Sequence, residues 1–119
     1  VMIYKIAYKD KSLVYATDTE GYVGANKKLV LFARDTDLLI HDAQYTSEEY
    51  LNAYFSKQGY GHSTFDMALE TFSQAKAKSL AFFHFDPNYN DEFLLEIENH
   101  YTENCKSCFV PKEGQEIVL

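Results

Sequence analysis

Short apolar runs that alternate with helix-like segments are the feature that most limits the folds open to this chain. Residues 12–17 and 38–40 have the composition of buried strands, and residues 26–34 between them have the apolar spacing of a short helix. Two strands joined by one helix pair in parallel through a right-handed crossover. The pattern therefore predicts an α/β domain built on a mixed sheet, with its helices mainly on one face.

The other elements are predicted from alternation, turn residues and helix caps. Residues 3–8 and 12–17 flank Asp10-Lys11, which favours an opening hairpin. Hydroxyl and carboxylate residues ahead of apolar faces indicate where helices begin. The further expected elements are helices at 46–57, 64–75 and 91–103, the last capped by Asp91, a buried strand at 80–83, and a closing hairpin of residues 109–110 and 117–119 around Glu113-Gly114.

Length and charge narrow the class of protein. The 119 residues suit one compact domain, and the net charge of −7 gives no general attraction for nucleic acid. Positive charge for a phosphodiester substrate would have to come from metal ions or from another segment. No apolar run reaches the ~18 residues that a membrane span needs, and no signal peptide is visible. We therefore expect a cytoplasmic protein without a membrane partner.

The two cysteines, Cys105 and Cys108, form a single C-x-x-C pair. Zinc ribbons need two such pairs, and a redox-active pair is typical of a helix start beside a strand. Here the pair follows a charged helical segment. We expect two reduced, structurally neutral thiols, with the metal and redox interpretations left open.

Polar residues follow three of the expected buried strands. Asp18, Asp42 and His84 each come directly after such a run, and His62 lies in a glycine-flanked loop that opens a helix. Ligand sites of open α/β sheets lie at the carboxyl ends of the strands, so the four side chains are expected to converge. Carboxylates and imidazoles together are what a divalent-metal hydrolase needs.

Each residue taken singly has a simpler interpretation. Asp18 could be a turn residue, His62 a helix-start residue, and Asp42 a cap for the loop that follows it. A single histidine at a strand end is more often a hydrogen-bonded structural residue than a ligand. The prediction therefore rests on the combined pattern of the four residues and not on any one of them.

Four segments, in order, resemble motifs of the metallo-β-lactamase superfamily. They are residues 16–20 (Ala-Thr-Asp-Thr-Glu), 38–45 (Leu-Leu-Ile-His-Asp-Ala-Gln-Tyr), 61–64 (Gly-His-Ser-Thr) and 83–87 (Phe-His-Phe-Asp-Pro). The resemblance is to the phosphodiesterase branch, which includes ribonuclease Z and the cyclic phosphodiesterases. It is closer still to a bacterial group of stand-alone or sensor-fused metallo-hydrolases. It covers nearly the whole chain and keeps the order and approximate spacing of the motifs.

The resemblance implies a role for each site residue. Asp18 resembles the metal-bridging aspartate, and His84 resembles the last metal-binding histidine. His62 resembles the histidine that protonates the leaving oxygen or holds the scissile phosphate. Asp42 stands where the branch places an acid that orients this histidine, which would fix its tautomer. Asp86 is expected to support the site from the second shell.

The family's first-half signature, His-x-His-x-Asp-His, does not occur in this sequence. The four histidines stand at positions 41, 62, 84 and 100, and neither His41 nor His100 matches a catalytic position. His41 is expected beside the sheet, and His100 on a solvated helix face. The chain (residues 1–119) is thus expected to be the C-terminal half-domain of an αββα sandwich, with the N-terminal half missing. Two protein ligands fall short of the three that catalytic zinc usually takes.

The function expected from the resemblance is a metal-dependent phosphodiesterase that uses water activated by two ions. Zinc is the first expectation, with manganese or iron as alternatives. The expected partners are a phosphodiester substrate, the missing N-terminal half and a second copy of the chain. Nucleic acid is expected only as a substrate. The chain by itself is expected to be inactive. The alternative is a non-catalytic half-domain that serves dimerisation or regulates a fused sensor, and a lactone or thioester hydrolase is a weaker third option.

Overall fold

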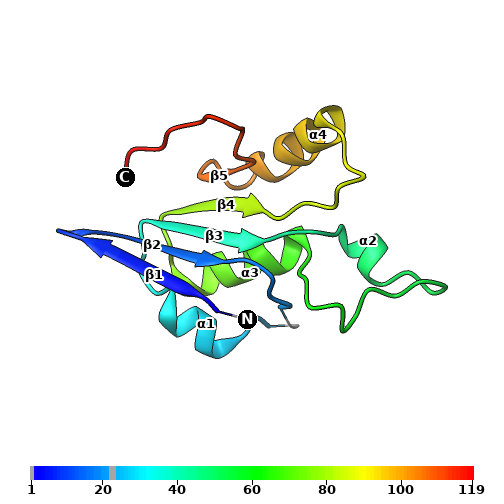
Figure 1. Ribbon diagram of the computed structural model, residues 1–119, viewed down its shortest axis with the longest axis horizontal. Helices are drawn as coiled ribbons and strands as arrows, with labels where there is room; N and C mark the ends of the chain where they lie inside the picture. Colours follow the sequence, from blue (N-terminus) through cyan, green and yellow to red (C-terminus); the bar gives the residue numbers. More distant parts are fainter. Residues whose placement is uncertain (1, 22–23) are drawn as a thin grey trace.

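Five strands form one sheet in the computed structural model, which describes residues 2–21 and 24–119. The strands lie in the order β1-β2-β3-β4-β5, and three longer helices and one short helix connect or flank them (Figure 1). The strands are β1 (Tyr4–Tyr8), β2 (Lys11–Ala16), β3 (Leu38–Asp42), β4 (Ser79–Phe83) and β5 (Cys108–Phe109); the helices are α1 (Lys27–Phe32), α2 (Ser47–Tyr50), α3 (Phe65–Ala75) and α4 (Asp91–Thr102).

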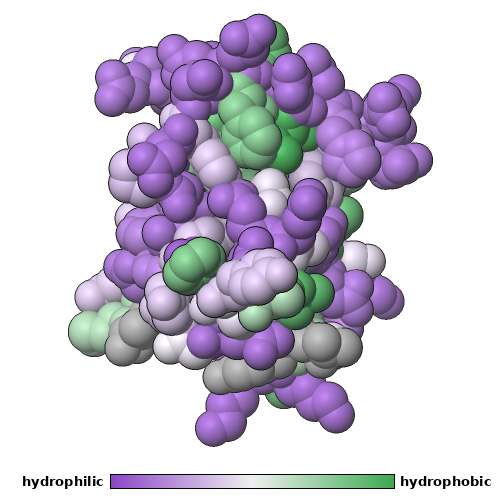
Figure 2. Space-filling model, turned by 90° about the vertical axis from the view of Figure 1, so that its right-hand side faces the viewer, coloured by the Kyte–Doolittle hydropathy of each residue, from purple (hydrophilic) through white to green (hydrophobic). Residues whose placement is uncertain are grey.

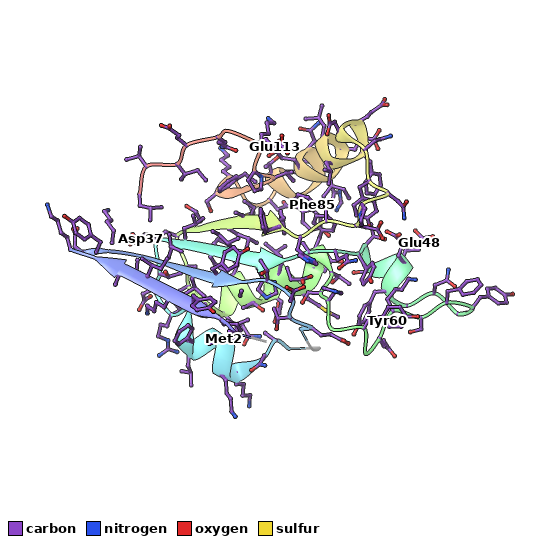
Figure 3. All side chains as sticks on the ribbon, in the orientation of Figure 1. Met2, Asp37, Glu48, Tyr60, Phe85 and Glu113 are labelled. Atoms are coloured by element: carbon purple, nitrogen blue, oxygen red, sulfur yellow. A yellow bond between two sulfur atoms is a disulfide. The ribbon has the colours of Figure 1, made fainter. Side chains whose placement is uncertain are left out.

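The sheet is mixed, as the sequence predicts. β1 and β2 form the antiparallel opening hairpin, whereas β2, β3, β4 and β5 run parallel to one another. The parallel strands therefore have their carboxyl ends at one edge of the molecule. Asp37 precedes β3 at the opposite end from Glu48 and Tyr60, whose segments follow those carboxyl ends (Figure 3).

Side-chain caps set the start of each helix. Asn26 accepts hydrogen bonds from two backbone N–H groups at the start of α1, and Thr64 accepts one from Met67 at the start of α3. Thr46 and Glu49 form a reciprocal capping box on α2. Such caps satisfy N–H groups that have no partner within the helix, and each contributes about 1 kcal/mol.

The two faces of the sheet differ in burial. On one face the side chains of β2, β3 and β4 are fully buried and pack with apolar residues of α1 and α3. The other face is open at β1, where Tyr4, Ile6 and Tyr8 are 51%, 59% and 74% exposed. Figure 1 shows α1 and α3 on the same side of the strands. The predicted one-sided arrangement of helices is confirmed for these two helices.

The helix α4 packs against β5 at the edge of the sheet. Its Tyr101 ring contacts the rings of Phe65 and Phe82, with centroids 5.8 and 5.2 Å apart. The Glu98 carboxylate accepts a hydrogen bond from the backbone N–H of Val110 at 2.7 Å. The aromatic contacts join α4 to α3 and β4, and the Glu98 bond ties it to the segment after β5.

Three element predictions are corrected by the structure. α2 ends at Tyr50 rather than near residue 57, because the side chain of Asn52 accepts hydrogen bonds from the N–H groups of Tyr54 and Phe55 and forms a local turn. The cap of α4 is Asn90, and Asp91 is its first residue. The closing hairpin is wrong: β5 pairs in parallel with β4, and residues 117–119 form no strand.

The expectation of two reduced thiols is also wrong. Cys105 and Cys108 form a disulfide between the end of α4 and the start of β5. The Cα atoms are 5.4 Å apart, within the range of ordinary disulfides. The tight turn that follows α4 brings the pair together, with Cys108 N–H donating to the Cys105 carbonyl. Among the described residues, no helix is both long and apolar enough to cross a bilayer.

Candidate metal centre

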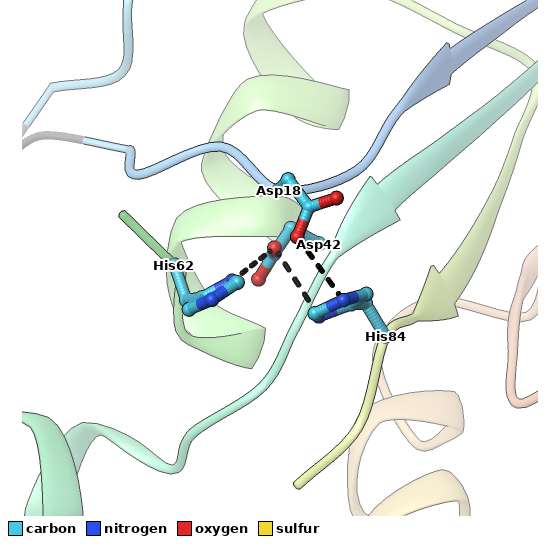
Figure 4. A group of neighbouring side chains, drawn as sticks. All are labelled: Asp18, Asp42, His62 and His84. Carbon is cyan, nitrogen blue, oxygen red and sulfur yellow. Dashed lines mark hydrogen bonds and ion pairs between the residues drawn. The ribbon is translucent and has the colours of Figure 1, made fainter. Parts of the chain in front are cut away.

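The sheet and one helix start bring four polar side chains to the same place (Figure 4). Asp18 follows β2, Asp42 is the last residue of β3, and His84 comes directly after β4. His62 arrives from the loop before α3, close to its cap Thr64. Parallel pairing of the three strands explains the convergence, since their carboxyl ends share one edge.

The four side chains lie close together and form two His–Asp contacts. His62 Nδ1 is 2.9 Å from Asp42 Oδ2, and His84 Nε2 is 3.1 Å from Asp18 Oδ1. The two imidazole rings are stacked, with centroids 4.8 Å apart and planes inclined by 16°. One ligand atom from each residue can be chosen so that all lie within 4.8 Å of one another. The site therefore consists of two His–Asp pairs placed side by side.

Asp42 is the fully buried member of the group and is held by four donors. Its Oδ1 accepts from the backbone N–H groups of Ser63 at 2.9 Å and Gln44 at 3.3 Å. Its Oδ2 accepts from His62 Nδ1 and, at 3.3 Å, from the N–H of Thr19. Buried carboxylates need such partners, and these fix the direction of the bond to His62. With Nδ1 donating to Asp42, Nε2 of His62 is the ring nitrogen left for another partner.

Two residues of the group have backbone conformations that side chains disfavour. Asp18 has φ of 51° and His84 has φ of 62°, both in the left-handed region. Only glycine enters this region without a steric cost, which is roughly 1–2 kcal/mol for other residues. Such conformations persist where the surroundings hold them and are concentrated at functional sites.

The donor set fits a divalent cation. The Asp18 carboxylate and the His84 imidazole are ligand types that zinc, manganese and iron all accept. His84 Nδ1 is buried without a hydrogen-bond partner among the described residues, and its nearest charged neighbour is Asp42 Oδ2 at 3.8 Å. Asp18, whose side chain is 61% exposed, is open for coordination. Two such ligands begin a metal site, and a catalytic zinc needs at least one more.

The fold of this chain superimposes on part of several solved structures. The metallo-beta-lactamase fold protein YhfI from Bacillus subtilis superimposes with a TM-score of 0.71 at 17% identity, over 93% of this chain and 41% of that one. Human tRNase Z, short form, superimposes with a TM-score of 0.68 at 20% identity, over 98% of this chain and 36% of that one. This chain matches one part of the metallo-β-lactamase fold. The fold class predicted from the sequence is confirmed.

The sequence relatives of this metallo-β-lactamase-fold chain include proteins named ribonuclease Z. Ribonuclease Z of Pyrococcus furiosus is 35% identical over 108 residues, which are 90% of this chain and 31% of the relative. Ribonuclease Z of Bacillus subtilis is 34% identical over 90 residues, which are 76% of this chain and 27% of the relative. The chain thus spans about a third of the length of these relatives. No protein-family model matches it. The predicted resemblance to the ribonuclease Z branch is confirmed.

The other polar residues singled out in the sequence are not members of this group of four. The Asp86 carboxylate accepts from the N–H of Asn88 at 2.8 Å and so closes its own turn; its second-shell role stays a prediction. His41 is fully buried on the helix-covered face of this metallo-β-lactamase-fold sheet. Burial lowers the pKa of His41, and the hydrogen bond to the Asp42 carbonyl offsets only part of that effect. His100 is exposed on α4, as expected.

Sequence reasoning missed one residue of this site, Glu20. Its carboxylate accepts hydrogen bonds from the N–H groups of Gly59 and Gly61, at 2.9 and 3.0 Å, and from the hydroxyl of Tyr50 at 2.6 Å. Burial by itself would raise the pKa of Glu20, but these bonds and the nearby His62 lower it overall. The sequence signal for Glu20 is weak, because two of its partners are backbone N–H groups, and residue types do not reveal which backbone groups a side chain bonds.

Proposed function

We propose that this chain is the C-terminal half of a metal-dependent phosphodiesterase of the ribonuclease Z type. The observation that supports it best is the pairing of His62 with buried Asp42 beside the pair of His84 with Asp18. One pair has the composition of a proton donor with its orienting acid, and the other has that of metal ligands. The relatives named ribonuclease Z support RNA as the substrate.

In this proposal the two His–Asp pairs divide the work. Asp18 and His84 hold divalent ions, and the complete site holds two. Zinc is the first choice of metal, and manganese and iron are the alternatives. Lewis-acid activation of water and of the phosphate is the chemistry that such ions supply when bound. Asp42 holds His62 by its Nδ1, so that Nε2 can deliver a proton to the leaving oxygen of the cleaved phosphodiester. The surface around the strand ends is mainly hydrophilic, which suits a polar substrate (Figure 2).

The remaining metal ligands belong, in this proposal, to an N-terminal half of the same domain. The open face of the sheet supports a covering layer of this kind, because Tyr4, Ile6 and Tyr8 expose apolar surface there. Pairing with a second copy of the whole protein is part of the same proposal. We also propose a cytoplasmic location, in which cellular thiols would act to reduce the Cys105–Cys108 disulfide.

The test is cleavage of an RNA that carries a 3′ extension by the natural full-length protein, with and without added metal. Asp18→Ala should lower both the bound metal and turnover. His62→Ala should keep the metal and lose roughly 10²–10⁴-fold in kcat, the usual contribution of a general acid. His100→Ala is the matched control, since this exposed histidine lies outside the group. Undiminished turnover in both Asp18→Ala and His62→Ala would overturn the proposed roles of these residues. Absence of turnover in the natural full-length protein, with metal added, would favour the non-catalytic module instead.

A further inference from the structure

Glu20 connects two loops that approach the site from different parts of the chain. It lies two residues after Asp18, and its carboxylate reaches the loop that ends at His62. Both carboxylate oxygens are used: Oε1 accepts from the N–H of Gly61, and Oε2 accepts from the N–H of Gly59 and the hydroxyl of Tyr50. Hydrogen bonds to an ionised acceptor are shorter and roughly twice as strong as neutral ones.

The loop before His62 is held by two kinds of bond: short-range bonds within it, such as Tyr60 N–H to the Lys57 carbonyl at 3.2 Å, and the bonds from Glu20. Gly59 and Gly61 have φ of +83° and +86°, and an added Cβ at either position would meet nothing within 4 Å. Glycine has more conformational freedom than other residues, so bonds to the N–H groups of Gly59 and Gly61 restrict the loop where its backbone is most free. Glu20 supplies such contacts at two glycine N–H groups, one of them directly before His62.

A second set of bonds fixes the other side of His62. The hydroxyl of Ser63 donates to the carbonyl of Thr19 at 2.5 Å and accepts from the N–H of Gly21 at 2.8 Å. The N–H of Ser63 donates to buried Asp42. The loop that carries Asp18 is therefore joined to the loop that carries His62 both before and after the histidine.

We propose that Glu20 is a positioning residue for proton transfer: by holding Gly59 and Gly61 it sets His62 relative to Asp18 and to the phosphate. The inference rests on the proposed function, because it assumes that His62 donates the proton to the leaving oxygen. It adds a residue that touches neither metal nor substrate and acts through His62. A misplacement of about 1 Å in a catalytic group can cost roughly 10²-fold in rate.

The dependence of the rate on the leaving group distinguishes a positioning role from a merely structural one. An RNA substrate releases a ribose oxygen, which needs a proton as it leaves. Bis-(para-nitrophenyl) phosphate releases a nitrophenolate, which is stable as an anion and needs none. In the natural full-length protein, Glu20→Gln should lower kcat on RNA roughly tenfold to hundredfold and leave KM and the nitrophenyl rate within about twofold. Glu96→Gln, at an exposed position on α4, is the matched control.

A double variant shows whether Glu20 acts through His62. With His62→Ala already present, Glu20→Gln should have little further effect on RNA cleavage, because residues that act as a unit are not additive. An equal loss on both substrates, or a full additional loss in the double variant, would overturn the inference. If His62→Ala itself leaves RNA cleavage unchanged, the part of the proposed function that makes His62 the proton donor fails instead. If His62→Ala is impaired and Glu20→Gln is not, only the role of Glu20 fails.

Amide hydrogen exchange provides a readout that needs neither metal nor substrate. The N–H groups of Gly59 and Gly61 should be protected from exchange in the natural protein; at least one should lose that protection in Glu20→Gln, which keeps one acceptor oxygen, and both should lose it in Glu20→Ala. Protection of core strands such as β3 should stay the same in both proteins. Unchanged protection at the two glycines would contradict the proposed anchoring.

Discussion

At the scale of single residues, the site is built partly from disfavoured backbone conformations. Asp18 and His84, which we propose as metal ligands, both have positive φ, although neither is glycine. A side chain in this region costs free energy that the fold has to offset elsewhere. On backbone stability alone, glycine would be favoured at both positions.

The first prediction compares two substitutions at His84 in the metal-free protein. At an ordinary position, glycine is less stable than alanine by roughly 0.5–1 kcal/mol. At His84 the order should reverse, with His84→Gly more stable than His84→Ala by about 1 kcal/mol in urea unfolding. The neighbouring Phe83, which is not among the positive-φ residues, should show the ordinary order for the same two substitutions. An ordinary order at His84 as well would contradict the strained backbone.

Some site residues could be predicted from sequence and others could not, for a physical reason. Asp18, Asp42 and His84 follow apolar strand runs, so parallel pairing alone brings them to one edge. Glu20 contacts N–H groups that lie 39 and 41 residues away. Every residue except proline has such an N–H group, so residue types give no indication of the pairing. The positive φ values of Asp18 and His84 are hidden in the same way.

At the scale of elements, two interactions explain the wrong predictions. One is hydrogen bonding of a side chain to the backbone, and the other is strand pairing at the edge of the sheet. The apolar spacing after Thr46 favours a longer helix, but Asn52 captures two N–H groups and α2 ends at Tyr50. The open edge of β4 accepts β5, which removes the expected closing hairpin. The Cys105–Cys108 disulfide then links β5 to the end of α4. Helices with a clear cap and a buried face, such as α3, were predicted nearly in full.

The second prediction concerns this disulfide. Closing so short a loop should contribute about 2 kcal/mol to the free energy of unfolding, mostly by restricting the unfolded chain. Adding a reductant should therefore lower the urea midpoint of the protein. A protein with both Cys105→Ser and Cys108→Ser should have the lower midpoint from the start and not respond to the reductant. A midpoint that is the same in oxidised and reduced protein would show that the bond contributes nothing to stability.

At the scale of the whole molecule, burial is uneven across the sheet. One face is packed under α1 and α3, while the other exposes the aromatic and aliphatic side chains of β1. Exposed apolar surface of this kind marks a place where another layer of protein binds. The chain of 119 residues, kept by itself in solution, should consequently associate through this face.

The third prediction tests which face is responsible. Ile6→Lys places a charge on the open face, and it should shift the isolated chain from associated species toward the monomer in analytical ultracentrifugation and lower its binding of a hydrophobic dye. Leu31→Lys is the matched control, because Leu31 is 64% exposed but lies on α1, beneath the sheet. Equal effects of the two substitutions would mean that association does not depend on the open face.

The order of strands in the sheet also affects how the chain can be assembled during its synthesis. Every strand after β1 pairs with the strand made immediately before it, from β2 through β5. As the polypeptide leaves the ribosome, amino end first, each new strand meets an edge that already exists. No finished pair has to open to admit a later strand, so the sheet can grow in one direction at the pace of translation.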